Sequence, residues 1–89
     1  MKLYKITAQW CMSCIIMKSR MESFEEKIKD KCEIISLDAD NDKEEALKLN
    51  IGEKLPIYII KDGDNEVSRM IGEKGSKDIE KFLTEGGLL

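Results

Sequence analysis

The hydrophobic pattern of the chain changes abruptly around two cysteines, Cys11 and Cys14. Before them, residues 2–8 predict a strand, because Leu, Tyr, Ile and Thr favour a pleated surface. From Met12 onward, apolar residues recur every three or four positions, which is the spacing of one helix face. The cysteine pair therefore lies where a strand gives way to a helix, and the fold must begin with that unit.

The middle of the chain continues with a second strand and a short helix. Residues 32–37 are rich in Ile and predict the strand. Asn41 followed by Glu44 resembles a capping box, so a helix is expected over residues 42–50. Gly52 is placed to end this helix.

The last third of the chain predicts a hairpin and a final helix. Residues 57–60 form a short apolar run of the kind that is covered on both faces, and residues 67–71 return after the turn at residues 62–63. Ser76 is expected to cap the last helix. The buried stripe of this helix comprises Ile79, Phe82 and Leu83.

The predicted order of elements is β-α-β-α-β-β-α. A right-handed, parallel first crossover and an antiparallel closing hairpin give an α/β fold with a four-stranded mixed sheet flanked by helices on both faces. The chain has 89 residues and shows no internal repeat or linker. We therefore expect one domain that covers residues 1–89.

Charge and hydropathy exclude several classes of partner. The net charge is −3, and Lys and Arg are interleaved with Asp and Glu, so no basic face for nucleic acid is expected. The longest uncharged run, residues 6–17, is too short to span a membrane. No cleavage site follows the basic residues near the start, so no signal peptide is expected. These features predict a cytoplasmic protein without a membrane partner, and a monomer is expected.

The position of the cysteine pair favours thiol–disulfide chemistry. Spacing i to i+3 in a first helical turn brings two sulfurs close enough to bond. The N-terminal thiol faces unpaired backbone N–H groups and the positive end of the helix dipole, which favour thiolate over thiol. We therefore expect Cys11 to be an exposed nucleophile that attacks a substrate disulfide, and Cys14, one turn deeper, to resolve the mixed disulfide.

Two other uses of the pair are open at this point. Cys-x-x-Cys also occurs in zinc sites, but these usually need four Cys or His ligands, and the chain has three cysteines and no histidine. The second alternative is a pair of inert, buried cysteines, and the position of the pair between a strand and a helix disfavours it. The expectation is no metal and no cofactor other than a redox-active disulfide between Cys11 and Cys14.

Four motifs occur in order along the chain: Trp10-Cys11-x-x-Cys14, Leu55-Pro56 before the third strand, the Lys61-Asp62-Gly63 turn, and Gly72 before the last helix. Together they resemble the thioredoxin family over nearly the whole chain, without the extra N-terminal strand and helix of full-length members. The resemblance implies a thioredoxin-like domain and an enzyme that reduces protein disulfides. It also implies a thioredoxin reductase or glutathione as the electron donor.

The resemblance implies a substrate-binding role for four residues near the cysteines. Pro56 matches a cis-proline that presents the backbone of Leu55 to an extended substrate strand. Trp10 matches a flat apolar contact for the substrate, and Gly72 matches a glycine that lets the substrate approach. Simple packing of Trp10, a trans-proline at residue 56 and a turn glycine at residue 72 are the alternatives.

The sequence departs from the family at two places near the cysteines. Lys5 stands where thioredoxins usually carry a buried Asp, six residues before the first cysteine. Either its charge favours the thiolates, or, as we expect, it reaches solvent or pairs with an acid such as Glu33. Met12-Ser13 replaces the usual Gly-Pro, which leaves the reduction potential open. The third cysteine, Cys32, is expected to be a small buried hydrophobe.

Two competing functions remain. One is a non-enzymatic thioredoxin-like module that docks a partner and senses its redox state. The other is a glutathione-dependent glutaredoxin-type enzyme, but the chain has no Cys-Pro-Tyr-Cys, and Gly72 and Asp78 are too far apart for a Gly-Gly-x-Asp glutathione site. Turnover of a model disulfide separates the first from an oxidoreductase, and glutathione as the only donor separates the second.

Overall fold

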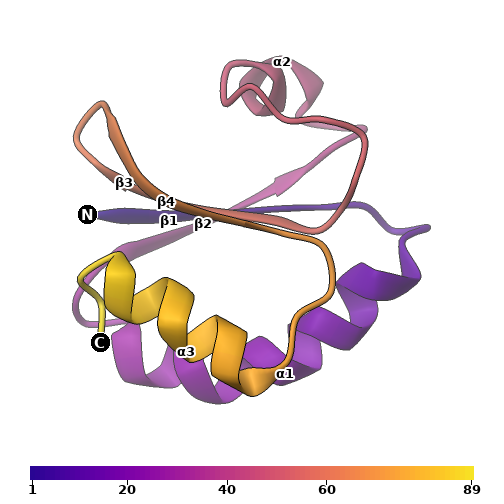
Figure 1. The fold of residues 1–89 in the computed structure, drawn as a ribbon. Helices are drawn as coiled ribbons and strands as arrows, with labels where there is room; N and C mark the ends of the chain where they lie inside the picture. Colours follow the sequence, from indigo (N-terminus) through magenta and orange to yellow (C-terminus); the bar gives the residue numbers. More distant parts are fainter.

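A computed structural model describes residues 1–89 and contains the seven elements in the predicted order (Figure 1). They are β1 (Lys2–Thr7), α1 (Met12–Ile28), β2 (Glu33–Asp38), α2 (Lys43–Leu47), β3 (Ile57–Asp62), β4 (Asn65–Ile71) and α3 (Ser76–Glu85). The strand order is β2-β1-β3-β4, in which β1 runs parallel to β2 and antiparallel to β3, and β4 runs antiparallel to β3. The predicted four-stranded mixed sheet is therefore confirmed.

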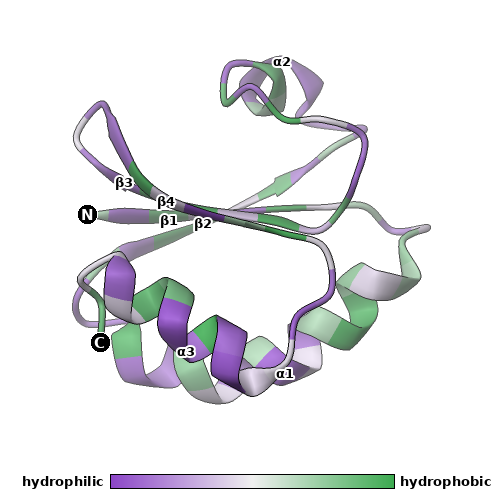
Figure 2. Ribbon diagram, in the orientation of Figure 1, coloured by the Kyte–Doolittle hydropathy of each residue, from purple (hydrophilic) through white to green (hydrophobic).

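The helices cover both faces of the sheet. Figure 1 shows the sheet edge-on, with α1 and α3 on one side and α2 on the other. Alternate residues of β1 serve the two sides: Leu3 joins the apolar cluster under α1 and α3, and Ile6 joins the cluster that contains Ala46 of α2. In Figure 2 the apolar colour follows the inner strands and the start of α1. Packing on both faces thus fixes β1, whose end leads directly into the cysteines.

The last helix is confirmed, but its cap is not the predicted one. Ile79, Phe82 and Leu83 are buried as expected. Ser76 is the first helical residue, and Gly75 is the N-cap without a side-chain cap bond. At the other end, a Cβ on Gly86 would collide with Ile60 Cδ1, so the chain needs glycine there to approach the sheet. No helix of the structure is both long and apolar enough to span a bilayer.

The second helix is shorter than predicted and ends for a different reason. It stops at Leu47, and the residue with left-handed backbone is Asn50 (φ 56°), not Gly52. The predicted capping box is also absent. The backbone N–H of Asn41 donates to Asp38 Oδ1 at 3.0 Å, and the carboxylate of the N-cap residue Asp42 accepts from the backbone of Asp38 instead of from the helix.

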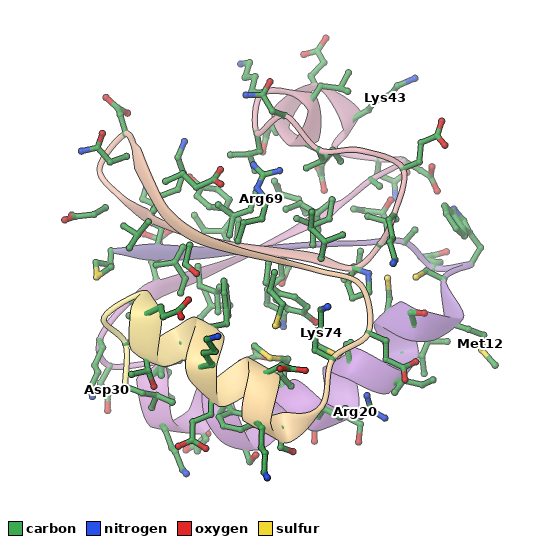
Figure 3. The ribbon with its side chains drawn as sticks, in the orientation of Figure 1. Met12, Arg20, Asp30, Lys43, Arg69 and Lys74 are labelled. Atoms are coloured by element: carbon green, nitrogen blue, oxygen red, sulfur yellow. The ribbon has the colours of Figure 1, made fainter.

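Arg69 of β4 binds the turn that follows α2. Its Nη2 donates to the carbonyl of Leu49 at 2.6 Å, and its Nη1 donates to the carbonyl of Asn50 at 3.1 Å. Glu66 holds the same guanidinium through two hydrogen bonds of 2.6 and 3.0 Å. Figure 3 shows Arg69 on the α2 side of the sheet. The arginine thereby ties the loop that leads to Pro56 to the edge strand.

We expect Glu66→Gln to weaken the pH dependence of stability. The hydrogen bonds from Arg69 lower the pKa of Glu66, so this carboxylate stabilises the fold above its unfolded pKa and ceases to do so as the pH falls through the folded pKa. The ion pair with Arg69 contributes at most about 1 kcal/mol to the free energy of unfolding, because the Glu66 side chain is 40% exposed. Urea unfolding at neutral pH and near pH 3 measures it. Glu80→Gln, a change at an exposed glutamate outside every ion pair of the chain, is the matched control.

Two outcomes would contradict this role of Glu66. Glu66→Gln could lower the free energy of unfolding equally at neutral and acidic pH, or it could lower it no more than Glu80→Gln does.

Candidate functional site

The first helix begins at the cysteine pair. Cys11 is the N-cap residue, with extended backbone (φ −90°, ψ 110°), and its Sγ accepts a hydrogen bond from the backbone N–H of Cys14 at 3.2 Å. Unpaired N–H groups and the positive end of the dipole meet at this point of a helix, so negative charge on the Cys11 sulfur is stabilised there. The predicted position of Cys11 at the positive tip of α1 is therefore confirmed.

The second cysteine is held in the thiol form. The pKa of Cys14 is raised to about 12, chiefly by burial and also by its hydrogen bond and charge interaction with Cys11, against a backbone hydrogen bond at Ala8 that lowers it. The two sulfurs therefore differ in their surroundings at neutral pH. The Cys11 sulfur accepts a hydrogen bond from a backbone N–H, whereas Cys14 is a protonated thiol.

The prediction that Cys11 is open to solvent is wrong. Cys11 is 7% exposed and Cys14 is 4% exposed. The two cysteines form a small cluster with Ala8, against which Ala39 and Leu55 pack. The cover over Cys11 therefore comes from two loop residues beyond β2 and before β3. The resemblance implied Leu55 near the cysteines, but the contact of Ala39 left no signal in the sequence because it joins segments far apart along the chain.

The third cysteine lies elsewhere. Cys32 is buried in the main apolar cluster, and its thiol donates to the carbonyl of Ile28 at 3.6 Å. Burial raises its pKa. The expected role of Cys32 as a small buried hydrophobe is confirmed. All three cysteines are free, and no three Cys, Asp or Glu side chains group together in a way that could hold a metal ion.

Trp10 is an exposed side chain fixed by one hydrogen bond. It is 68% exposed, and its Nε1 donates to Asp40 Oδ2 at 2.8 Å. Asp40 belongs to the turn after β2. In this turn the carboxylate of Asp38 accepts hydrogen bonds from the backbone N–H groups of Asp40 and Asn41. The indole of Trp10 therefore lies on the surface and not in the core.

Leu55, Pro56 and Gly72 lie close together, and Leu55 packs on the cluster that contains the two cysteines. The Leu55–Pro56 peptide bond is cis, as the resemblance implied. The backbone N–H of Gly72 donates to the carbonyl of Pro56 at 2.8 Å. Gly72 has φ +84°, and a Cβ there would lie 3.0 Å from Cε of Lys54. The space next to Gly72 is thus taken by the stem of Lys54.

An apolar groove extends from this point along the α2 face. It has a volume of about 410 Å³, and Trp10 and Leu55 contribute to its walls. The opposite wall comes from Leu47 and Ile51, and Leu47 is 56% exposed. Two of the predicted substrate contacts therefore line one groove, and the structure adds α2 and the loop after it, which the sequence did not single out.

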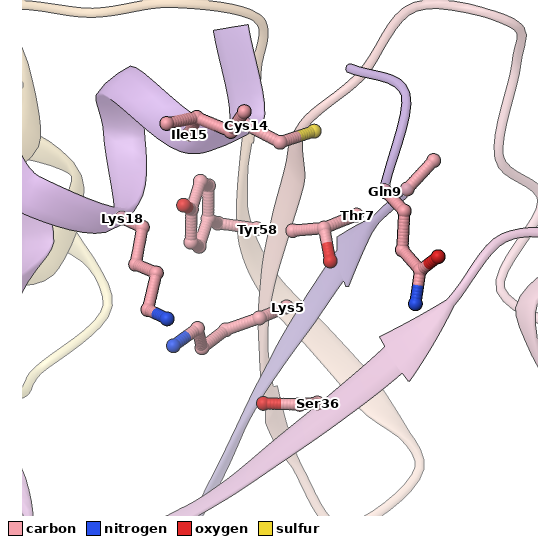
Figure 4. A pocket seen from close by; sticks show the side chains of 9 residues that line it. Lys5, Thr7, Gln9, Cys14, Ile15, Lys18, Ser36 and Tyr58 are labelled. Atoms are coloured by element: carbon pink, nitrogen blue, oxygen red, sulfur yellow. The ribbon is translucent and has the colours of Figure 1, made fainter. Parts of the chain in front are cut away.

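A second pocket lies on the other side of Cys14, between α1 and the sheet. It has a volume of about 270 Å³. Figure 4 shows Cys14 and Tyr58 along it, with the amines of Lys5 and Lys18 directed toward one another. Tyr58 is nearly fully buried, and burial together with the nearby charge of Glu25 raises its pKa. The sequence placed Tyr58 only within an apolar run and gave no signal for this pocket.

The predicted partner of Lys5 is wrong, although the expectation that Lys5 pairs with an acid is right. Its Nζ lies 2.8 Å from Oε1 of Glu25 in α1. Glu33 lies opposite Lys2 in the parallel pairing, whereas Lys5 lies opposite Ser36. Three strand positions, about 10 Å, therefore separate Lys5 from Glu33, and α1 crosses directly over Lys5.

The fold, with a Cys-x-x-Cys pair capping the first helix after a central strand, defines a thioredoxin-like domain. The family model described as thioredoxin matches residues 2–85. The chain belongs to the thioredoxin family. No relative was found among curated proteins.

Solved structures agree with this assignment. A thioredoxin from Fasciola hepatica is 28% identical, with a TM-score of 0.77 over 94% of this chain and 79% of its own. Thioredoxin-2 of the malaria parasite, a component of its protein secretion machinery, has a TM-score of 0.81 at 18% identity over 94% of this chain and 81% of its own. Another malarial protein has a TM-score of 0.81 at 18% identity over 96% and 94%. The two malarial proteins support the fold alone.

Proposed function

We propose that this protein is a thiol–disulfide oxidoreductase that reduces disulfides in proteins, with Cys11 as nucleophile and Cys14 as resolving thiol. The single observation that carries the proposal is the hydrogen bond from the backbone N–H of Cys14 to the Sγ of Cys11 at the start of α1. It stabilises a thiolate at the sulfur that would attack, while burial keeps the other sulfur protonated until it is needed.

The reaction proceeds by two exchanges. The Cys11 thiolate attacks one sulfur of the substrate disulfide, a mixed disulfide forms, and the other substrate sulfur leaves as a thiolate that takes a proton from solvent. Cys14 then loses its proton and attacks the Cys11 sulfur. A bond forms between Cys11 and Cys14, and the second substrate thiol is released. Two electrons have passed to the substrate, and an external donor restores the dithiol.

Substrate recognition is proposed at Leu55 and Trp10. No backbone hydrogen bond within the chain involves the N–H or the carbonyl of Leu55, which precedes β3 and packs on the cysteines. An extended substrate segment can pair with these free groups, and such pairing makes little demand on side chains. Trp10 and the apolar groove beside it would receive a neighbouring apolar side chain of the substrate.

The test is reduction of insulin by dithiothreitol with and without a catalytic amount of the protein. We expect the protein to shorten the time to precipitation of the insulin B chain, because each molecule turns over many times. Absence of acceleration would reject the enzyme in favour of a redox-sensing or docking module. A parallel assay with glutathione as the only donor would identify a glutaredoxin-type enzyme if it supported the same rate.

The cellular setting follows from the same chemistry. We propose a cytoplasmic monomer, recharged by a thioredoxin reductase or by glutathione, because a reducing compartment keeps the pair as the dithiol that the mechanism starts from.

A further inference from the structure

The pocket behind Cys14 carries a positive charge. Nine residues line it, among them Lys5 and Lys18, and none of the nine is an acid. Figure 4 shows the amines of Lys5 and Lys18 directed toward one another, with Tyr58 and Cys14 along the same pocket. The lining of this pocket therefore combines Cys14 with two cations and no carboxylate.

Lys5 is fixed in this position. The Lys5 side chain is 16% exposed, and that of Glu25 is 19% exposed. The Lys5 amine lies 2.8 Å from the Glu25 carboxylate. Glu25 does not line the pocket, because it lies eleven residues beyond Cys14 on α1. The carboxylate thus cancels part of the lysine charge.

The other ionisable groups around the pocket do not change this balance. From β3 comes Tyr58, which is neutral at physiological pH because burial raises its pKa. The strand β2 contributes only Ser36, which carries no charge. From the far side of Cys14 comes Cys11, whose negative charge is consumed once it is bonded to a substrate sulfur.

Resolution is the step at which this charge matters. Burial makes the Cys14 thiolate costly, yet resolution requires that thiolate. A cation across a partly solvated pocket lowers the cost of the anion directly, without accepting its proton.

We infer that Lys5 and Lys18 stabilise the Cys14 thiolate across the pocket and thereby accelerate resolution of the mixed disulfide. This inference rests on the proposed function. The Cys14 proton passes to solvent in the pocket, the thiolate attacks the Cys11 sulfur, and the sulfur–sulfur bond to the substrate breaks as its electron pair leaves with the substrate thiolate. Because both lysines act through their charge on Cys14, they are positioning residues, and Glu25 positions Lys5.

The test is stopped-flow reaction of excess reduced protein with dithiodipyridine, in a Cys32→Ala background so that only the pair reacts. This reagent is uncharged, so removal of a lysine does not alter its encounter with the protein. Attack by Cys11 releases one coloured thione in a bimolecular phase. Attack by Cys14 releases the second in a first-order phase, whose rate below the pKa of Cys14 follows its thiolate fraction.

We expect Lys5→Met to slow the first-order phase about two- to fivefold, and Lys5→Met combined with Lys18→Met to slow it about tenfold. The loss is the same factor at every pH below the pKa of Cys14, and the bimolecular phase is unchanged. Lys5→Arg restores the rate. Lys29→Met, which removes a charge from α1 outside the pocket, has no effect.

Two failures are distinguishable. Equal first-order phases in the wild type and in the lysine variants overturn the role of the pocket and leave the proposed function intact. Release of one thione only, with no first-order phase in the wild type, overturns resolution by Cys14 and with it the proposed function. Thermal unfolding of each variant shows that it is folded, and loss of rate in Lys5→Arg equal to that in Lys5→Met would assign Lys5 a purely structural role.

Discussion

Cys11→Ser is expected to lower the protein's contribution to insulin reduction by at least about a hundredfold, to the rate of dithiothreitol alone. The hydroxyl of serine has the same position and the same hydrogen bond from the backbone of Cys14, but it is not a nucleophile toward disulfides. The fold is expected to be unchanged, because the substitution leaves the helix with an excellent N-cap residue. The measurement is the rate of turbidity increase at equal protein concentration.

Cys14→Ser is expected to abolish turnover in a different way. Cys11 remains able to attack, so the variant accumulates as a mixed disulfide with its substrate, which mass spectrometry of non-reduced samples detects. Cys32→Ala is the matched control: it removes a buried thiol far from the site and is expected to retain turnover and trap nothing. If Cys11→Ser retained the wild-type rate, or if Cys14→Ser formed no adducts, the assigned roles would be wrong.

Leu83→Ala is expected to have the largest effect on stability. Leu83 is fully buried in the cluster between α3 and the sheet, and its truncation removes apolar contacts and leaves a cavity. The expected loss is about 2–5 kcal/mol. This is a large share of the total for a domain of this size, and it corresponds to a fall in Tm of roughly 10–30 °C.

The matched control for Leu83→Ala is Leu47→Ala. Leu47 is also a helical leucine, but it is 56% exposed in the apolar groove. We expect its truncation to change stability by about 0.5 kcal/mol or less. Thermal and urea unfolding of both variants measure the contrast. Equal losses would mean that α3 is not packed on the sheet in the way the structure describes.

Much of the fold was predictable because its signals are local. The periodicity before and after Cys11 identified β1 and α1, and the apolar run at residues 57–60 identified β3. Helix ends were predicted less well. Asn50, not Gly52, adopts the left-handed backbone, and Arg69 of β4 holds the carbonyls of Leu49 and Asn50 just after α2. A cap formed by a distant side chain leaves no pattern in the neighbouring sequence.

The features of the site also separate into those set by neighbouring residues and those set by distant contacts. The sequence by itself determined that two thiols lie at the positive tip of a helix, since spacing and element order are properties of adjacent residues. Only the tertiary structure decided the rest of their surroundings: Ala39 against their cluster, and Glu25 as the partner of Lys5. Such contacts join residues about twenty or more positions apart, and they form only when helices and loops pack on the sheet.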